Sequence, residues 1–182
     1  EPAFYQLINN QLHELSVNLN GKIGWKPILS TFQLRMTALG YNNGDGFLYS
    51  FDSLSHELIR IYKSGALQSL GIPVHETNGD KLKVQLVFGE IFNSVFVAYS
   101  PLDKLLYWID ITTNTYTTSP SLPDTEMVNL SYSHTDNLFW SVAENSTLYS
   151  ISPQSKNVLR EIPVRGLPSG KFNATGNLWI SK

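Results

Sequence analysis

The chain has 182 residues, of which 42% are hydrophobic and 15% are charged, and its net charge is -2. This length and composition predict one globular domain with a real core and exclude an intrinsically disordered chain. The charge balance gives no basis for nucleic-acid binding, which needs concentrated Lys and Arg. No apolar run approaches the roughly 18 residues of a membrane-spanning helix. Cysteine is absent, which excludes disulfides and thiolate chemistry.

In chain order, the apolar runs are short and are separated by Asn, Asp, Gly or Pro, a pattern typical of β-hairpins. The N-terminal part predicts a hairpin of Phe4–Ile8 and Leu12–Val17, followed by a short outer strand at Trp25–Leu29. A complete four-stranded unit comes next. Its predicted strands are Leu34–Tyr41, Phe47–Asp52, Glu57–Tyr62 and Leu67–Ile72.

The second unit follows the polar loop Val74–Asp80 and is the longest. Its predicted strands are Leu82–Phe88, Ile91–Tyr99, Leu105–Asp110 and Tyr116–Ser119. The third unit is predicted at Val128–Tyr132, Leu138–Ala143, Leu148–Ile151 and Val158–Ile162, and a further unit begins at Lys171–Ser181. No stretch shows the i, i+3, i+4, i+7 apolar spacing of an amphipathic helix over a convincing length.

The predicted strands repeat one motif, an apolar strand that follows an Asp/Asn/Gly turn. Copies begin at Tyr41, Tyr99 and Tyr132, and weaker ones at Phe4 and Phe172. Units of about 40 residues with four strands each predict a β-propeller, because a single unit cannot bury both its faces and must stack on its neighbours. We therefore expect an all-β fold, one domain over residues 1–182, with about five four-stranded blades. The N- and C-terminal strands are expected to close one blade, which removes an exposed edge.

Two of these segments resemble known propeller repeats. Leu106-Tyr107-Trp108-Ile109-Asp110 resembles the YWTD repeat of low-density-lipoprotein-receptor-type propellers, with Ile109 where that motif has Thr. The segment from Gly166 to Ile180 is similar to the NHL and gluconolactonase-like repeat, whose enzymes hold a metal through carboxylate and amide ligands at the channel mouth. Asn173 and Thr175 stand where that repeat usually shows acids. The resemblance therefore implies the propeller fold, and neither a metal site nor a lactonase activity.

The aspartates Asp45, Asp103 and Asp136 could be interpreted as a carboxylate cluster. They occupy equivalent turns of successive repeats, however, where a carboxylate accepts backbone N–H bonds and shapes the turn, and we favour that structural role. Aromatic residues recur one strand position later in the motif. Tyr5, Tyr49, Tyr107, Phe139 and Trp179 are predicted to share a position and to fill the layers between blades, while Trp108 and Trp140 pack on the opposite blade face. Stacking of the first set on sugar rings is the alternative.

Ligands are expected in the loops that differ between blades, because the strands themselves are alike. The loops are Asn20–Ser30, Val74–Lys81, Ser119–Met127 and Pro163–Lys171. The candidate ligand-binding residues are Trp25, His75, Glu76, Asp80, Asp124, Glu126 and Arg165. The histidines show no metal-ligand spacing, no serine has a nucleophile-elbow glycine pattern, and no glycine loop fits a phosphate. We predict no catalytic residue, metal or cofactor.

The leading hypothesis is a non-enzymatic recognition module that binds a protein or a glycan through one end of the ring. A five-bladed glycoside hydrolase or lactonase-like hydrolase is the alternative, and it requires acids that converge at the channel mouth. Two or three acids would be required, and they would come from Glu57, Asp80, Glu90, Asp124 or Glu126. A third hypothesis is an architectural domain of a larger adhesive or matrix protein. Glycosylation sequons at Asn129, Asn145 and Asn173 favour a secreted or extracellular location.

Overall fold

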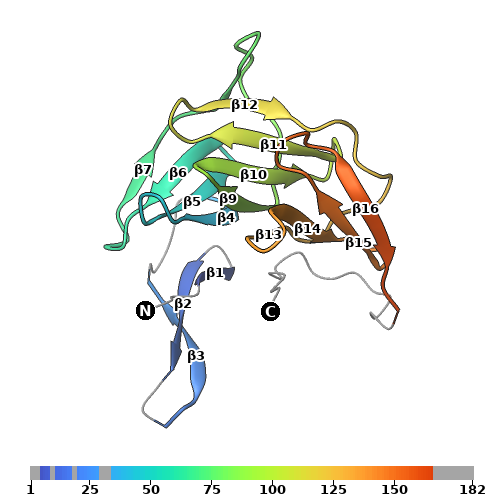
Figure 1. The fold of residues 1–182 in the computed structure, drawn as a ribbon. Coiled ribbons are helices and arrows are strands. Elements are labelled where there is room, and N and C mark those ends of the chain that lie inside the picture. The colour runs from blue at the N-terminus through green and yellow to red at the C-terminus, as the bar shows by residue number, and fades with distance from the viewer. Residues whose placement is uncertain (1–4, 9–10, 18–19, 29–33, 166–182) are drawn as a thin grey trace.

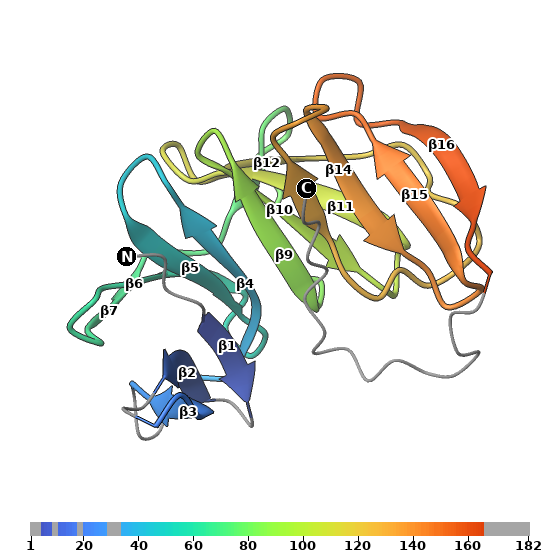
Figure 2. The same cartoon turned by 60° about the horizontal axis from the view of Figure 1, so that its bottom comes forward.

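The computed structural model describes residues 5–8, 11–17, 20–28 and 34–165, and within these ranges every regular element is a β-strand (Figure 1). The strands form four sheets, which follow one another in chain order along an arc (Figure 2). One edge strand of each sheet contacts the edge strand of the next, β1 with β4, β4 with β9, and β9 with β13. This arrangement is that of a β-propeller with four blades.

The first sheet has the order β1-β2-β3, and its strands are β1 (Tyr5–Ile8), β2 (Gln11–Val17) and β3 (Ile23–Pro27). The second sheet consists of β4 (Met36–Asn42), β5 (Phe47–Asp52), β6 (Glu57–Ile61) and β7 (Leu67–Ser69). The third has the order β8-β12-β11-β10-β9, with β8 (Val74–His75), β9 (Phe88–Phe92), β10 (Val95–Ser100), β11 (Leu105–Asp110) and β12 (Thr115–Thr118). The fourth consists of β13 (Ser131–Ser133), β14 (Leu138–Val142), β15 (Thr147–Ile151) and β16 (Val158–Pro163).

The prediction of an all-β propeller is confirmed, and the predicted number of about five blades is wrong, since the described residues form four. The strand that was expected to begin a further unit, Lys171–Ser181, lies outside the described residues, and so does its expected pairing with the N-terminal hairpin. Among the described strands, β1, β2 and β3 form a sheet of their own. The four sheets are the N-terminal hairpin with its outer strand and the three complete predicted units, so the fifth predicted blade depended on Lys171–Ser181.

The third sheet departs most from the prediction. The expected strand Ile91–Tyr99 is two strands, β9 and β10, joined by a tight turn in which Asn93 and Ser94 both have positive φ, 48° and 61°. Two such residues make the hairpin turn whose twist matches the strands, although without the glycine that usually reveals it in a sequence. The loop expected at Val74–Asp80 contains β8, which pairs in parallel with β12. The expected strand Leu82–Phe88 reaches regular pairing only at Phe88.

Six of the described hairpin turns share one design. The first residue is Asp, Ser or Asn and the fifth has a positive φ; the turns are Asn42–Gly46, Asp52–His56, Ser100–Lys104, Asp110–Asn114, Ser133–Asn137 and Ser152–Lys156. In five of them the N–H of the fifth residue donates to the carbonyl of the first. The first side chain usually accepts a backbone N–H inside the turn, as Asp52 does from Leu54 and Ser55. These short polar side chains therefore replace the backbone partners that the strands lose where they end.

The fourth turn position explains the repeated aspartates. Asp45 accepts the Phe47 N–H and the Tyr49 hydroxyl, at 3.0 and 2.6 Å. Burial and this bond raise the pKa of Tyr49 to about 12, so its phenol stays protonated as a donor. Asp103 accepts the Tyr107 hydroxyl in the same way, at 2.8 Å. A structural role in the turn is confirmed for both: Asp45 accepts a backbone N–H as predicted, and Asp103 accepts the hydroxyls of Ser100 and Tyr107.

The contact of the third aspartate shows that the aromatic residues of the repeats were aligned wrongly in the prediction. Asp136 accepts the indole N–H of Trp140, at 3.0 Å, so Trp140 and not Phe139 occupies the position of Tyr49 and Tyr107. Phe139 is fully buried on the opposite face of its strand. Trp179, which was assigned to the same position, lies outside the described residues.

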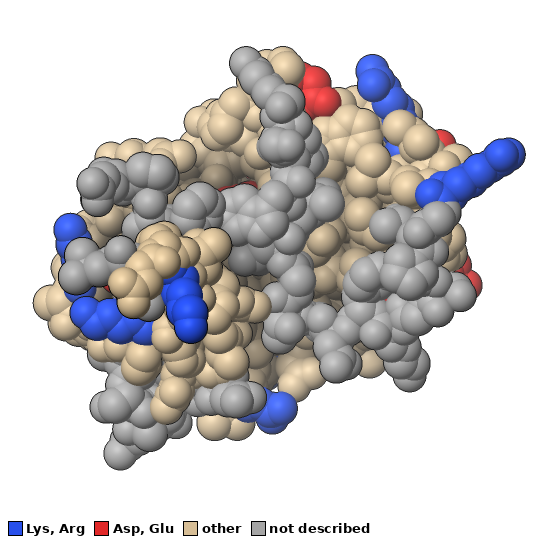
Figure 3. Space-filling view, turned by 90° about the horizontal axis from the view of Figure 1, so that it is seen from below, with Lys and Arg blue, Asp and Glu red and all other residues tan. Residues whose placement is uncertain are grey.

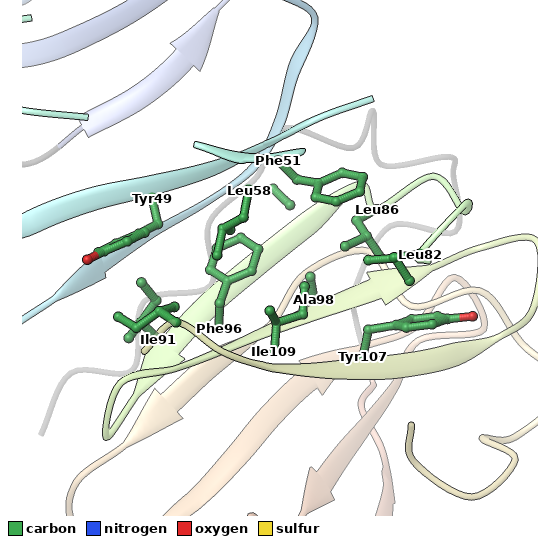
Figure 4. Packing of buried hydrophobic residues seen from close by; sticks show 12 residues of the cluster. Tyr49, Phe51, Leu58, Leu82, Leu86, Ile91, Phe96, Ala98, Tyr107 and Ile109 are labelled. Atoms are coloured by element: carbon green, nitrogen blue, oxygen red, sulfur yellow. The ribbon is translucent and has the colours of Figure 1, made fainter. Parts of the chain in front are cut away.

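The motif is also displaced by one strand in the third sheet. Tyr49 lies on the second strand of its sheet and Tyr107 on the third, because the tight turn at Asn93 adds a hairpin before the motif. Moving by one strand reverses the face on which the motif aromatic points. Tyr49 and Tyr107 consequently enter the same layer from opposite sheets, and both are buried there around Phe96 (Figure 4). Their predicted role in filling a layer between blades is confirmed, although they do not occupy matching places.

The layer between the third and fourth sheets is also aromatic. Trp108 points into it, opposite to Tyr107 on the same strand, and meets Phe139 edge to face with ring centroids 5.4 Å apart. Tyr99 stacks on Phe88 at 5.1 Å in this layer. The prediction that Trp108 packs on the other blade face is therefore confirmed.

The close packing of β4 on β9 is tested by a glycine substitution. A Cβ atom at Gly40 on β4 would lie 2.8 Å from Cγ1 of Ile91 on β9. We expect Gly40→Ala to lower the free energy of unfolding by about 1–3 kcal/mol, because the two inner strands must separate. Gly24→Ala on β3 is the matched control, since its Cβ would meet nothing within 4 Å. Urea denaturation of the two variants measures the difference, and equal midpoints would contradict this packing.

Candidate functional site

A groove of about 250 Å³ lies between the third and fourth sheets. Its apolar and aromatic lining consists of Phe92, Val95, Trp108, Tyr116 and Pro153. Its polar lining consists of Glu76, Asn93, Asp110, Thr115, Thr117 and Lys156. We call this the inter-sheet groove. It mixes an ammonium, two carboxylates, an amide and hydroxyls above an aromatic floor.

The groove exists because three turns meet at the same end of two sheets. The antiparallel register places the tight turn at Asn93 beside the turn Asp110–Asn114, since Val95 pairs with Asp110 on the neighbouring strand. The turn Ser152–Lys156 of the fourth sheet faces them. Trp108 and Thr117 are paired across β11 and β12, so both point into the layer between the sheets and form the floor.

Lys156 is the central charged group of the groove. Its Nζ donates to the Thr117 hydroxyl and lies 5.6 Å from the centroid of the Trp108 ring, within cation–π range. The side chain is half-buried, and burial lowers the pKa of this ammonium while the nearby Glu76 carboxylate acts against that shift. Across the described ranges the only ion pair within 4 Å joins Lys104 and Asp124, so Lys156 has no carboxylate in direct contact.

The other polar groups of the groove differ in how far they are already engaged. Asp110 Oδ1 accepts the N–H groups of Thr112 and Thr113, at 2.7 and 3.1 Å, so it also shapes its turn. The Trp108 indole nitrogen is buried without a hydrogen-bond partner. Glu76 is exposed at the rim, where its backbone N–H donates to the Tyr116 carbonyl.

Of the residues predicted from the sequence, Glu76 alone lines the groove, and the others are dispersed. His75 lies on β8 with its ring edge-to-face against Tyr116, and Asp80 accepts the Asn78 amide at 2.8 Å. Asp124 pairs with Lys104. The remaining candidates are exposed in the first sheet, in the connection after β12, and after β16; they are Trp25, Glu126 and Arg165.

Of the four predicted loops, Val74–Lys81 contributes Glu76 to the groove, whereas Ser119–Met127 and the start of Pro163–Lys171 lie elsewhere. Ser119–Met127 follows β12 and Pro163 ends β16, at the end of the sheets where β10 turns into β11, because Tyr107 pairs with Thr118. The groove opens at the opposite end. On the face seen in Figure 3, the described Lys and Arg side chains stand in separate small groups, and most of the surface of the described residues is uncharged.

The acids proposed for a hydrolase do not converge. Glu57 accepts the Ser69 hydroxyl at the edge of the second sheet, at 2.9 Å, and Asp124 pairs with Lys104 in the third. Glu90 lies on β9, where its carboxylate accepts only the adjacent Ile91 N–H, at 3.0 Å. In the part of the chain that the structure describes, no three His, Asp or Glu side chains gather as a metal site requires, and no helix is long and apolar enough to cross a membrane.

Two of the three predicted sequons lie among the described residues. Asn145 is exposed in the turn before β15, and its side-chain oxygen accepts the Thr147 N–H at 3.1 Å. Asn129 accepts the Val142 N–H at 3.1 Å and is partly buried. Asn173 lies outside the described residues.

Four residues that line the groove were not predicted from the sequence as members of one site: Trp108, Asp110, Thr117 and Lys156. A signal for the floor was present, because Thr115 and Thr117 alternate with Tyr116 and therefore make one face of that strand polar. Lys156 gave no signal, since it lies in the fourth sheet about 40 residues away from the strand it meets.

Comparison with known proteins identifies the repeat. A family model described as "Repeat of unknown function (DUF6923)" matches residues 5–181. The chain belongs to this family. No match is found among curated proteins.

Solved structures that resemble this member of the repeat family are propeller proteins of diverse activity. Virginiamycin B lyase from Staphylococcus aureus superposes with a TM-score of 0.56 and 18% identity, over 86% of this chain and 50% of its own. Glutaminyl cyclase from Myxococcus xanthus superposes with a TM-score of 0.58 and 16% identity, over 78% of this chain and 63% of its own. A chain of a nidogen/laminin complex superposes with a TM-score of 0.61 and 10% identity, over 87% of this chain and 60% of its own. The chain thus spans between half and 63% of these proteins, and at such identities the likeness shows the fold alone.

Glu90 generates a testable pH dependence. Burial raises its pKa to about 7 from the model-peptide value of 4.5, so the folded state favours the neutral acid. The stability from this neutral carboxyl is fully present below about pH 4.5 and is lost as the pH rises through 7. We expect Glu90→Gln, which keeps an acceptor for the Ile91 N–H, to raise the free energy of unfolding at pH 8 by up to about 3 kcal/mol.

At pH 4 the same substitution should have little effect, because the carboxyl is then neutral in both states. Denaturant titrations of both proteins at pH 4 and pH 8 measure this difference. A Glu90→Gln effect that is equal at the two pH values would show that the carboxyl is not buried as described.

Proposed function

We propose that this chain is a non-enzymatic recognition module that binds a glycan in the inter-sheet groove. The observation that carries the proposal is the composition of the groove, where hydroxyl, amide, carboxylate and ammonium groups surround aromatic side chains. Sugars present both hydroxyls and apolar C–H faces, and such a lining can bind both. The few convergent polar groups in an otherwise apolar cleft are also the usual form of a small-ligand site.

The geometry favours binding over hydrolysis. A glycoside hydrolase needs two carboxyl groups that face the same bond, one of them able to donate a proton. The groove contains Asp110, whose carboxylate is held by two backbone N–H groups of its own turn, and Glu76, which is exposed at the rim. Neither group is positioned by another side chain in the way that catalytic acids usually are.

A pair of threonines on one strand tests the proposal. Thr117 faces the groove, whereas Thr118 is paired with Tyr107 and faces the other layer. We expect glycan binding, detected on an array and quantified by calorimetry, to weaken about 5- to 10-fold in Thr117→Val, because one hydrogen bond worth about 1 kcal/mol is lost. Thr118→Val should bind as the unmodified protein does.

Two outcomes would contradict the proposal. Equal loss of binding in the two threonine variants would place the ligand elsewhere. Sustained turnover of a glycoside by the unmodified protein would identify an enzyme instead.

A further inference from the structure

The ammonium group of Lys156 has more hydrogen-bond donors than described partners. A lysine has three N–H donors, and the described contacts of Nζ are one hydroxyl, that of Thr117, and the face of Trp108. The side chain is half-buried, so water cannot solvate the charge as it solvates an exposed lysine. No carboxylate of the described residues lies within 4 Å of it.

An equivalent lysine in the same protein shows the contrast. Lys104 occupies the same fifth position of its turn, with φ 55° compared with 61° for Lys156. Lys104 is directly paired with the carboxylate of Asp124, at the end of the sheet where β10 turns into β11. Lys156 instead turns its charge toward a groove and leaves it without a pair. A partly desolvated cation with unfilled donors attracts an anionic ligand group more strongly than an exposed, paired one does.

The rest of the lining restricts which anion fits. Glu76 and Asp110 line the same groove, and their negative charges repel a dianion such as a phosphate more than a single carboxylate. Their oxygens, with those of Thr115, Thr117 and Asn93, instead suit a ligand that carries several hydroxyl groups. The volume of about 250 Å³ accommodates one ligand unit and not an extended surface.

We propose that the inter-sheet groove selects a uronic acid unit, with its carboxylate on Lys156 and its hydroxyls on the polar side chains of the groove. This inference rests on the proposed glycan-binding function and names its ligand class. The carboxylate completes the donor set of Lys156, and the sugar ring lies over the aromatic lining. The carboxylate of Glu76 at the rim then limits the negative charge of the ligand, because it repels a ligand with two negative charges more than a ligand with one.

The test compares matched probes on the intact protein. Methyl glucuronide and methyl galacturonide are titrated against the corresponding neutral methyl glycosides and against inorganic sulfate, by calorimetry or by NMR shifts. We expect the uronides to bind at least 10-fold more tightly than the neutral glycosides. Added salt should reduce this preference, because it screens a charge–charge interaction.

Variants of the two equivalent lysines locate the selectivity. Lys156→Gly removes the ammonium and relieves the positive φ, which glycine adopts freely, so loss of binding cannot be attributed to a strained turn. We expect this variant to lose the preference for uronides, and Lys156→Gln, which keeps most of the side chain, to lose it as well. Lys104→Gly is the matched control and should keep the preference. Glu76→Gln should bind uronides about two- to threefold more tightly, because a nearby negative charge is gone.

The outcomes separate the two proposals. Equal binding of uronides and neutral glycosides would overturn the uronic acid proposal and leave glycan recognition standing. Sulfate binding as tight as that of a uronide would also overturn it, because the site would then be a simple anion site. Retained preference in Lys156→Gly would place the carboxylate elsewhere and contradict the assignment. If no glycoside of either kind binds, both proposals fail.

Discussion

The fold depends on the burial of apolar sheet faces against neighbouring sheets. Each sheet has two faces, and strands of five or six residues are too short to form a core by themselves. The layer around Phe96 and the layer around Phe139 remove both faces of the third sheet from water. Tyr49 and Tyr107, which are fully and almost fully buried, contribute to the first layer from opposite sides. The sheets are therefore stable only as a stacked series, which is the physical basis of a propeller.

Turn chemistry makes that stacking compatible with satisfied hydrogen bonds. The strands end in turns whose Asp, Ser or Asn side chains accept backbone N–H groups, and whose last residue takes a left-handed conformation. In three of these turns the aspartate also holds the aromatic residue four positions later, as Asp45 holds Tyr49. The buried phenol or indole thus finds its polar partner at the sheet end, where the ring can be buried and its polar group satisfied.

The candidate site follows from a change in this repeating pattern. The tight turn at Asn93 adds a hairpin that displaces the motif by one strand in the third sheet. As a result Tyr107 faces the second sheet and Trp108 faces the fourth, beside a polar face of β12. The turn of the fourth sheet then brings Lys156 over Trp108. The groove is thus built from the turns of two different sheets above a floor that belongs to the core between them.

The sequence by itself determined the all-β class, most strands, the structural role of the repeated aspartates, and the burial of Tyr49, Tyr107 and Trp108. It could do so because alternation and turn chemistry are local properties, set by residues within one hairpin. The number of blades, the division of Ile91–Tyr99 into two strands, and the displaced motif were decided by tertiary structure. The sheet face toward which an aromatic side chain points depends on how many strands precede its strand in the sheet. The turn at Asn93 and Ser94 adds a strand, and it is hard to predict from the sequence because it contains no glycine. The inter-sheet groove was likewise beyond sequence reasoning, because Lys156 and Thr117 meet only when two separate sheets pack against each other.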